Sequence, residues 1–303
     1  MADLSVNVAG VRFENPLVAA SGTFGFGREY GEFYPLSALG GISCKGITLK
    51  RRDGNPPPRI AETPSGILNA VGLQNPGVDV FIEEDLPWLK QQNTVVIANI
   101  AGNTVEEYCQ MAEKLSETGV DMIELNISCP NVKSGGVQFG TSCESVGNIT
   151  AEVRRHCKKP LIVKLSPNVT DIASIAQSAE ASGADALSMI NTLTGMRIDI
   201  RTRRPIIRNN TGGLSGAAVF PVAVRMVWRV ANAVKIPIIG MGGISTWEDA
   251  VEMLMAGATA LQIGTVLFSD PYAPVKITEG LNSFLDENGI KSVSELTGTV
   301  IPW

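Results

Sequence analysis

The chain has 303 residues, of which 44% are hydrophobic, and it carries a formal net charge of −5. This length and composition can bury a sizeable core, and the acidic balance argues against a nucleic-acid-binding protein, which normally presents a basic surface. No low-complexity tract or Pro/Ser/Gly-rich linker divides the sequence. We therefore expect a single domain over residues 1–303.

The start of the sequence lacks a basic segment followed by an apolar core, and no apolar run is long enough to span a bilayer. Five cysteines occur without a Cys-x-x-Cys pair, which fits reduced thiols and leaves no ligand set for an iron–sulfur cluster. The single histidine, His156, follows two arginines and predicts a basic helix end. We expect a cytoplasmic protein with neither a metal site nor a histidine-based triad.

The predicted elements begin with a hairpin of residues 5–8 and 11–13, which turns at Ala9 and Gly10 and covers the bottom of a barrel. Short, almost continuously apolar runs follow, as expected for parallel strands that are buried on both faces. These predicted strands lie near residues 17–20, 41–45, 66–69, 95–100, 122–126, 161–164, 186–190, 237–240 and 260–264.

A weak internal repeat indicates the fold. Helical spacing over residues 106–118, 172–182 and 247–256 is followed each time by a glycine and then by a buried strand. Helix–strand alternation of this kind requires a parallel sheet. About eight such units predict an α/β TIM barrel with loop insertions at its carboxyl face, and an open doubly wound sheet is the alternative.

Polar residues end several of the predicted strands. The strand at 122–126 ends in Asn126 and is followed at once by Ser128, Cys129 and Asn131, with Pro130 preventing its continuation. Other strands end in an amide or an amine, at Lys45, Asn99, Lys164 and Asn191. Amides can recognise the edge of a heterocycle, and a buried lysine can stabilise negative charge on it. A turn that only ends a strand is the alternative.

The last two strands end in glycines, at Gly242 and Gly243 and at Gly264, which precedes Thr265. In TIM barrels these loops commonly bind phosphate through backbone N–H groups, although a Gly-Gly pair can also be a simple tight turn. Residues 245–246 are candidate N-caps of the next helix. A phosphate beside amides and lysines suggests flavin mononucleotide, and no Gly-x-Gly-x-x-Gly dinucleotide fingerprint lies between a strand and a helix.

Taken together, these motifs resemble the dihydroorotate dehydrogenases, in particular the catalytic subunits of their class 1B, over essentially the whole chain. The matching segments are residues 20–27, 68–77, 126–132, 163–168, 189–192, 212–216 and 240–244. The resemblance implies an FMN-dependent oxidation of dihydroorotate to orotate in pyrimidine biosynthesis.

The resemblance also implies roles by position. Cys129 would be the base that removes the C5 proton, with Lys45 and Lys164 as the other catalytic residues and the C6 hydride passing to the flavin. The substrate would contact Lys45, Asn69, Val71, Gly72, Leu73, Asn126, Asn191 and Thr192. FMN would contact Ser21, Lys45, Gly46, Asn99, Asn126, Lys164, Ile190, Gly216, Gly242, Gly243, Gly264 and Thr265.

Four further expectations concern loops and cysteines. Residues 130–140 contain three glycines and predict a mobile loop that closes over the substrate, the alternative being an ordinary long loop. Residues 196–208 contain five arginines and predict a solvated hairpin, with a docking surface for an acidic partner as the alternative. The other cysteines, at 44, 109, 143 and 157, are expected to be structural. Cys44 should point away from its neighbour Lys45 by strand alternation.

A cysteine rather than a serine at position 129 is unlike the membrane-bound, quinone-linked class, and the loop sequences resemble class 1B more than the fumarate-using class 1A. Class 1B implies a partner subunit that carries FAD and a 2Fe-2S cluster and reduces NAD, around a homodimer of this chain in a heterotetramer. The alternatives are class 1A, a dihydropyrimidine dehydrogenase-type domain, a non-redox lyase or synthase barrel, and a flavin-free scaffold barrel.

Overall fold

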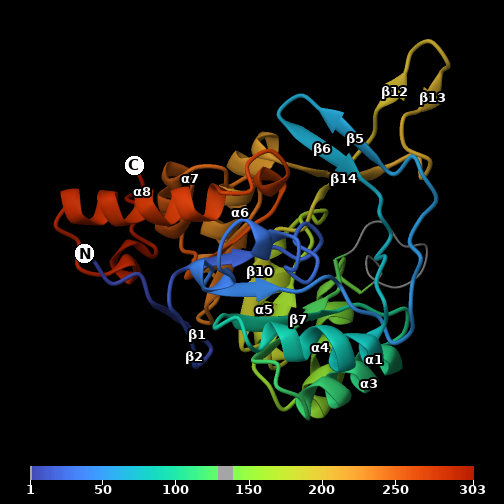
Figure 1. Cartoon of the computed structure of the whole chain (residues 1–303), viewed down its shortest axis with the longest axis horizontal. Coiled ribbons are helices and arrows are strands. Elements are labelled where there is room, and N and C mark those ends of the chain that lie inside the picture. The colour runs from blue at the N-terminus through green and yellow to red at the C-terminus, as the bar shows by residue number, and fades with distance from the viewer. Residues whose placement is uncertain (1, 129–138) are drawn as a thin grey trace.

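A closed barrel forms the centre of the computed structural model, which describes residues 2–128 and 139–303 (Figure 1). The barrel strands are Leu17–Ala19 (β3), Gly41–Ser43 (β4), Val95–Ile100 (β7), Met122–Asn126 (β8), Leu161–Lys164 (β9), Ala186–Met189 (β10), Ile238–Met241 (β15) and Ala260–Ile263 (β16). They pair in parallel in the order β10, β15, β16, β3, β4, β7, β8, β9. The predicted TIM barrel is confirmed, and the doubly wound alternative is wrong.

The helices pack on the outside of this barrel, where α3 contacts β7 and β8, α6 contacts β15 and α7 contacts β16. Their bounds are Val78–Val80 (α1), Leu86–Leu89 (α2), Val105–Ser116 (α3), Cys143–His156 (α4), Ile172–Ala181 (α5), Phe220–Ala231 (α6), Trp247–Met255 (α7) and Ala273–Glu287 (α8). Short 3₁₀ or π turns lie at Tyr30–Glu32, Leu36–Ala38, Phe81–Asp85, Ala217–Val219, Thr265–Phe268 and Val293–Leu296. The three helices predicted from the repeat are α3, α5 and α7.

The predicted N-terminal hairpin is present as Val6–Val8 (β1) and Val11–Phe13 (β2), which pair antiparallel. Phe13 is fully buried beneath β4. A Cβ added to Gly41, the first residue of β4, would lie only 2.8 Å from Phe13 Cε1. The hairpin therefore packs against the amino end of the barrel, as predicted, and leaves the carboxyl end open.

A second, antiparallel sheet is built from the insertions that follow β4 and β10. Its strands are Leu193–Gly195 (β11), Gly212–Ser215 (β14), Gly66–Asn69 (β6) and Ile60–Thr63 (β5), in that order. The strand predicted at residues 66–69 therefore exists, but it is not one of the buried parallel strands. Its partner is distant in sequence, since Leu68 pairs with Leu214.

The arginine-rich segment forms the predicted hairpin, with strands Ile198–Asp199 (β12) and Arg204–Pro205 (β13). Figure 1 shows it projecting from the barrel beside the second sheet. Arg197 Nη1 donates a hydrogen bond to the carbonyl of Glu62, 2.7 Å away, and so ties the base of the hairpin to the end of β5.

Three of the four described cysteines are buried, as expected of structural residues, and the fourth is not. Cys44, Cys109 and Cys157 are buried, and Cys143 is exposed at the start of α4. Burial raises the pKa of the Cys44 thiol, which keeps it protonated and unreactive. His156 ends α4 beside two arginines, as predicted. No helix within the described residues is both long and apolar enough to cross a membrane.

Candidate active site

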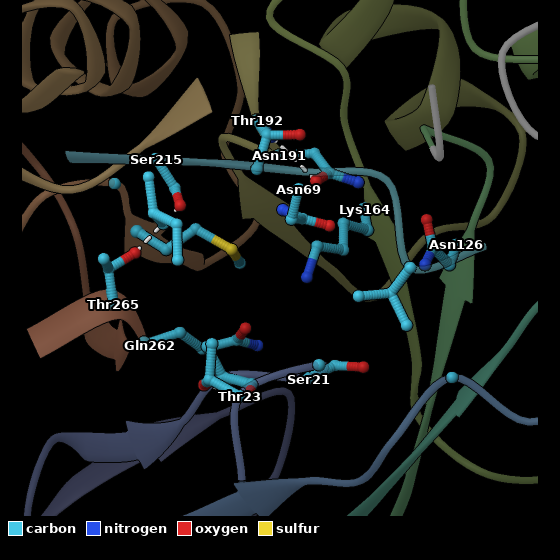
Figure 2. Close-up of a pocket in the computed structure, with 18 of the residues that line it drawn as sticks. Ser21, Thr23, Asn69, Asn126, Lys164, Asn191, Thr192, Ser215, Gln262 and Thr265 are labelled. Atoms are coloured by element: carbon cyan, nitrogen blue, oxygen red, sulfur yellow. Dashed lines mark hydrogen bonds between the residues drawn. The ribbon is translucent and has the colours of Figure 1, made fainter. Parts of the chain in front are cut away.

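A cavity of about 360 Å³ lies where the carboxyl ends of the barrel strands meet the second sheet. Figure 2 shows polar side chains pointing into it from several strands. The predicted site residues that line it are Ser21, Lys45, Gly46, Asn69, Val71, Gly72, Leu73, Asn126, Lys164, Ile190, Asn191, Thr192, Gly242, Gly243, Gly264 and Thr265. Residues predicted from eight separate parts of the chain are thus brought together around one space.

Two of the predicted residues that the structure describes, Asn99 and Gly216, are not part of this lining. Cys129 and most of the predicted closing loop lie outside the described residues. Asn99 is fully buried one layer below, where its Oδ1 accepts a hydrogen bond from Asn126 Nδ2 at 3.3 Å. Gly216 lies behind Gly243, because a Cβ added to Gly243 would lie 2.8 Å from the Gly216 carbonyl oxygen.

The charge of the cavity is positive. Among the described lining residues, only Lys45 and Lys164 carry a formal charge. Lys164 ends β9 and is only 4% exposed. Two ammonium groups in a confined space favour ligands that are anionic or become anionic during a reaction.

A buried carboxylate, Glu124, lies at the centre of the barrel beneath the cavity floor. Its Oε2 accepts hydrogen bonds from Asn99 Nδ2 and from Ser43 Oγ, the latter at 2.6 Å. Its Oε1 accepts from Ser188 Oγ at 2.6 Å and from Gln262 Nε2 at 2.9 Å. One side chain of β8 is therefore bonded to β4, β7, β10 and β16.

Glu124 remains ionised despite complete burial. Burial by itself raises the pKa of this carboxyl group, but the Lys164 ammonium and the hydrogen bonds from Ser188, Ser43 and Asn99 more than offset it. The net result is a pKa below the ordinary value of glutamic acid. An ionised carboxylate only accepts hydrogen bonds, so each of its four partners must direct a donor group toward it.

A chain of hydrogen bonds runs from this carboxylate to the predicted substrate residues. Asn99 donates to Glu124, and Asn126 Nδ2 donates to Asn99 Oδ1. Asn126 Oδ1 accepts from Ser128 Oγ at 3.1 Å, and Ser128 Oγ accepts from Asn191 Nδ2 at 2.8 Å. The orientation of each amide is therefore fixed by its neighbour, which preorganises the polar wall of the cavity.

Glycines form another part of the cavity wall, together with Ser215 and Thr265, which Figure 2 shows on the side opposite Asn126. Gly242 and Gly243 have φ angles of 125° and 80°, which favour glycine. On the same wall, Thr265 Oγ1 donates to Ser215 Oγ at 2.9 Å. The small residues leave room for a ligand to approach the backbone closely.

The helix after this wall is capped by its own side chains. Thr246 is the N-cap of α7, as predicted, and Asp249 completes a capping box with it. Ser245 is not a cap, because its hydroxyl donates to the Gly243 carbonyl at 3.0 Å. The backbone N–H groups of Ser245 and Thr246 both donate to Asp249 Oδ2, so these two groups already have an acceptor within the chain.

Sequence reasoning missed several polar residues of the site. Ser215 and Gln262 line the cavity, and Glu124 organises its floor together with Ser43 and Ser188. A signal for four of them was present, since each interrupts an otherwise apolar barrel strand. A polar residue buried inside such a strand needs a hydrogen-bond partner in the barrel interior. Here Ser43, Ser188 and Gln262 all donate to Glu124.

No cluster of possible metal ligands occurs among the residues that the structure describes. Comparison with known proteins matches residues 3–285 to the family Dihydroorotate dehydrogenase. A protein of Lachnoclostridium phytofermentans named "Dihydroorotate dehydrogenase B (NAD(+)), catalytic subunit" is 57% identical over 98% of this chain and 99% of its own length. One of the same name from Petrotoga mobilis is 53% identical over 99% of this chain and its entire length. The chain belongs to the dihydroorotate dehydrogenase family.

Proposed function

We propose that this chain is the catalytic subunit of an NAD-linked dihydroorotate dehydrogenase and that it oxidises dihydroorotate to orotate for pyrimidine biosynthesis. The observation that carries the proposal is the cavity, where three asparagines and two lysines from distant parts of the chain meet. Full-length identities of 53–57% to relatives with this name support the same activity.

The amide groups suit a dihydropyrimidine substrate. Its ring carries N–H donors and carbonyl acceptors, which asparagine side chains can match, and its carboxylate is anionic. Asn69, Asn126 and Asn191 would hold the ring, while Lys45, Thr192 and the backbone of residues 71–73 would complete the contacts to the ring and the carboxylate. The Thr192 backbone N–H donates a hydrogen bond to Asn191 Oδ1 at 2.7 Å, which fixes the position of the two residues relative to each other.

The described residues also fit FMN. A Cβ on Gly243 would lie 2.8 Å from the Gly216 carbonyl oxygen and 2.8 Å from Phe220 Cβ, so glycine lets the wall pack closely here while its backbone lines the cavity. Gly242, Gly243, Gly264 and Thr265 would hold the phosphate, and Lys164 would face the pyrimidine edge of the ring. When bound, FMN supplies the acceptor for the hydride that leaves C6 of dihydroorotate.

The remaining chemistry would fall to Cys129. Removal of the C5 proton needs a base beside the substrate, and Cys129 directly follows Ser128, which hydrogen-bonds to both Asn126 and Asn191. Lys164 would stabilise negative charge that develops on the reduced ring. The amides preorganised by Glu124 would hold the substrate in place without having to reorient during the reaction.

The electrons would leave through a partner. The relatives' names contain both "catalytic subunit" and NAD, and we propose that a second subunit with FAD and a 2Fe-2S cluster carries electrons from this chain to NAD. A homodimer of this chain at the centre of a heterotetramer, located in the cytoplasm, completes the proposal.

The test is an anaerobic titration of the purified, flavin-loaded chain with dihydroorotate. Loss of the flavin absorbance band, with one orotate formed for each flavin reduced, is the expected result. An unchanged spectrum with dihydroorotate, or reduction by a dihydropyrimidine that lacks the carboxylate, would contradict the assignment. Orotate and uracil are separated by chromatography, so the product identifies the substrate class directly.

A further inference from the structure

Gln262 presents an unsatisfied acceptor at the cavity. Its side chain extends from β16, lines the cavity and is only 1% exposed. Its Oε1 is buried and has no hydrogen-bond partner among the described residues. Buried polar atoms in folded proteins almost always have a partner, so this oxygen indicates a group that is absent from the polypeptide.

The orientation of this amide is determined by Glu124. Gln262 Nε2 donates to Glu124 Oε1 at 2.9 Å. If the amide were rotated by half a turn, its oxygen would face the carboxylate, which has no proton to donate while it is ionised. Glu124 therefore forces the Gln262 oxygen away from itself, and Figure 2 shows the amide pointing into the space between the labelled residues.

We infer that Gln262 is a further cofactor-binding residue and that its Oε1 accepts a hydrogen bond from a hydroxyl group of the ribityl chain of FMN. The inference rests on the proposed function, because it takes FMN as the ligand. Glu124 acts through Gln262 and is a positioning residue.

Position along β16 favours the ribityl chain over the flavin ring. Gln262 precedes the predicted phosphate-binding residues Gly264 and Thr265 by two and three positions. β16 ends at Ile263, and even a fully extended chain spans at most about 3.3–3.6 Å per residue, so Gln262 lies within roughly 11 Å of both. Figure 2 shows Gln262 between Thr265 on one side and Lys164 on the other. The ribityl chain joins phosphate to ring and must cross this interval.

The test measures the affinity of the apoprotein for FMN, for its 2′-, 3′- and 4′-deoxyribityl analogues and for 3-methyl-FMN, by quenching of flavin fluorescence. Wild type should bind one deoxy analogue roughly five- to tenfold more weakly than FMN, the effect of one neutral hydrogen bond. Gln262→Met keeps the length of the side chain but removes the acceptor. It should bind FMN more weakly by a similar factor and should no longer discriminate against that analogue.

Ser188→Ala is the matched control. Ser188 donates to the same Glu124 oxygen as Gln262 but is not among the cavity-lining residues, so this variant should retain wild-type discrimination. Discrimination that persists in Gln262→Met overturns the inference. The inference is also overturned if wild type binds 3-methyl-FMN more weakly than FMN and Gln262→Met loses only this difference. Gln262 Oε1 would then accept its hydrogen bond from the ring N–H and not from a ribityl hydroxyl. A wild-type apoprotein that does not bind FMN at all contradicts the proposed function instead.

Discussion

Cys129 is the residue on which the proposed chemistry depends most directly. Replacing it with alanine should leave flavin binding intact, because none of the predicted FMN contacts is altered. Flavin reduction by dihydroorotate should slow by about 10²–10⁴-fold, the usual effect of losing a general base. Stopped-flow absorbance at neutral pH measures this rate. A near-normal rate in Cys129→Ala would assign the base to another group.

Cys129→Ser provides the graded comparison. An alcohol is a much weaker acid than a thiol, whose ordinary pKa is about 8.5, so a serine is seldom deprotonated at neutral pH. The serine variant should therefore reduce its flavin slowly at neutral pH and faster as the pH is raised. A flat pH profile for the serine variant would show that residue 129 does not exchange the proton.

Glu124 makes a prediction about stability. Because its pKa is held below the ordinary value, the carboxylate stabilises the fold above about pH 4.3, and this contribution is lost as the pH falls through the folded-state pKa. Glu124→Gln should lower the free energy of unfolding at pH 7 by about 3–5 kcal/mol, because Lys164 then stays buried without that charge. The difference from wild type should shrink toward acid pH.

Urea denaturation at several pH values from 3 to 7, using fluorescence, measures this difference. Glu117→Gln is the control, since Glu117 forms an exposed ion pair with Lys158 and should contribute little. A constant difference between wild type and Glu124→Gln across this range would mean that the carboxylate is not ionised in the fold.

At the scale of elements, the loop after β16 should be sensitive to charge. Thr265→Glu would place a carboxylate on the wall that is proposed to bind phosphate, and the repulsion should leave the purified protein largely without FMN. Thr265→Val keeps the shape of the side chain and loses only the bond to Ser215, so most of the flavin should remain. Flavin content by absorbance compares them, and equal contents would place the phosphate elsewhere.

A separate prediction concerns the second sheet and its contact with Thr192, a proposed substrate-binding residue. A Cβ on Gly213 in β14 would lie 2.0 Å from Thr192 Oγ1, so Gly213→Ala must displace Thr192. Loss of one substrate contact should raise the KM for dihydroorotate roughly five- to tenfold, while the flavin content stays unchanged. Gly119→Ala is the control, because its added Cβ would meet nothing closer than 3.7 Å. An unchanged KM in Gly213→Ala would separate Thr192 from substrate binding.

The elements differ in how well sequence predicted them. Barrel strands such as β8 and β9 are continuous apolar runs, because both faces are covered, and such runs are visible without knowledge of their partners. The second sheet gave no comparable signal. Its strand β5 alternates exposed and half-buried residues, and β6 pairs with β14 across the register Leu68–Leu214. A pairing so distant in sequence is decided by the barrel that brings the strands together.

The site was predicted unevenly for a related reason. Lys164 and Asn191 stand at strand ends, where a polar residue after an apolar run is conspicuous. Glu124 and Gln262 lie within strands, and their role depends on which residues face them across the barrel interior. Which residues face each other across the barrel interior cannot be read from the sequence until the strand order and register are known. Interior polar networks are therefore the part of such a site that structure adds.

At the scale of the whole molecule, the prediction concerns where electrons leave. The sequence contains no Gly-x-Gly-x-x-Gly fingerprint between a strand and a helix, and the structure describes no cluster of metal-ligating side chains. The chain should therefore oxidise dihydroorotate rapidly with an artificial dye but reduce NAD poorly by itself. Adding the FAD and 2Fe-2S subunit should restore NAD reduction, because that subunit would supply the missing electron path.

Steady-state turnover of the purified chain with NAD, with fumarate and with a dye, each with and without the partner subunit, tests this prediction. The control is a chain whose Cys129 is replaced by alanine, which should lose activity with every acceptor, since the defect precedes electron exit. Rapid fumarate reduction by the chain alone would instead assign it to the fumarate-using class. Efficient NAD reduction without a partner would remove the need for a second subunit, because the electrons would then leave the barrel directly to the nucleotide.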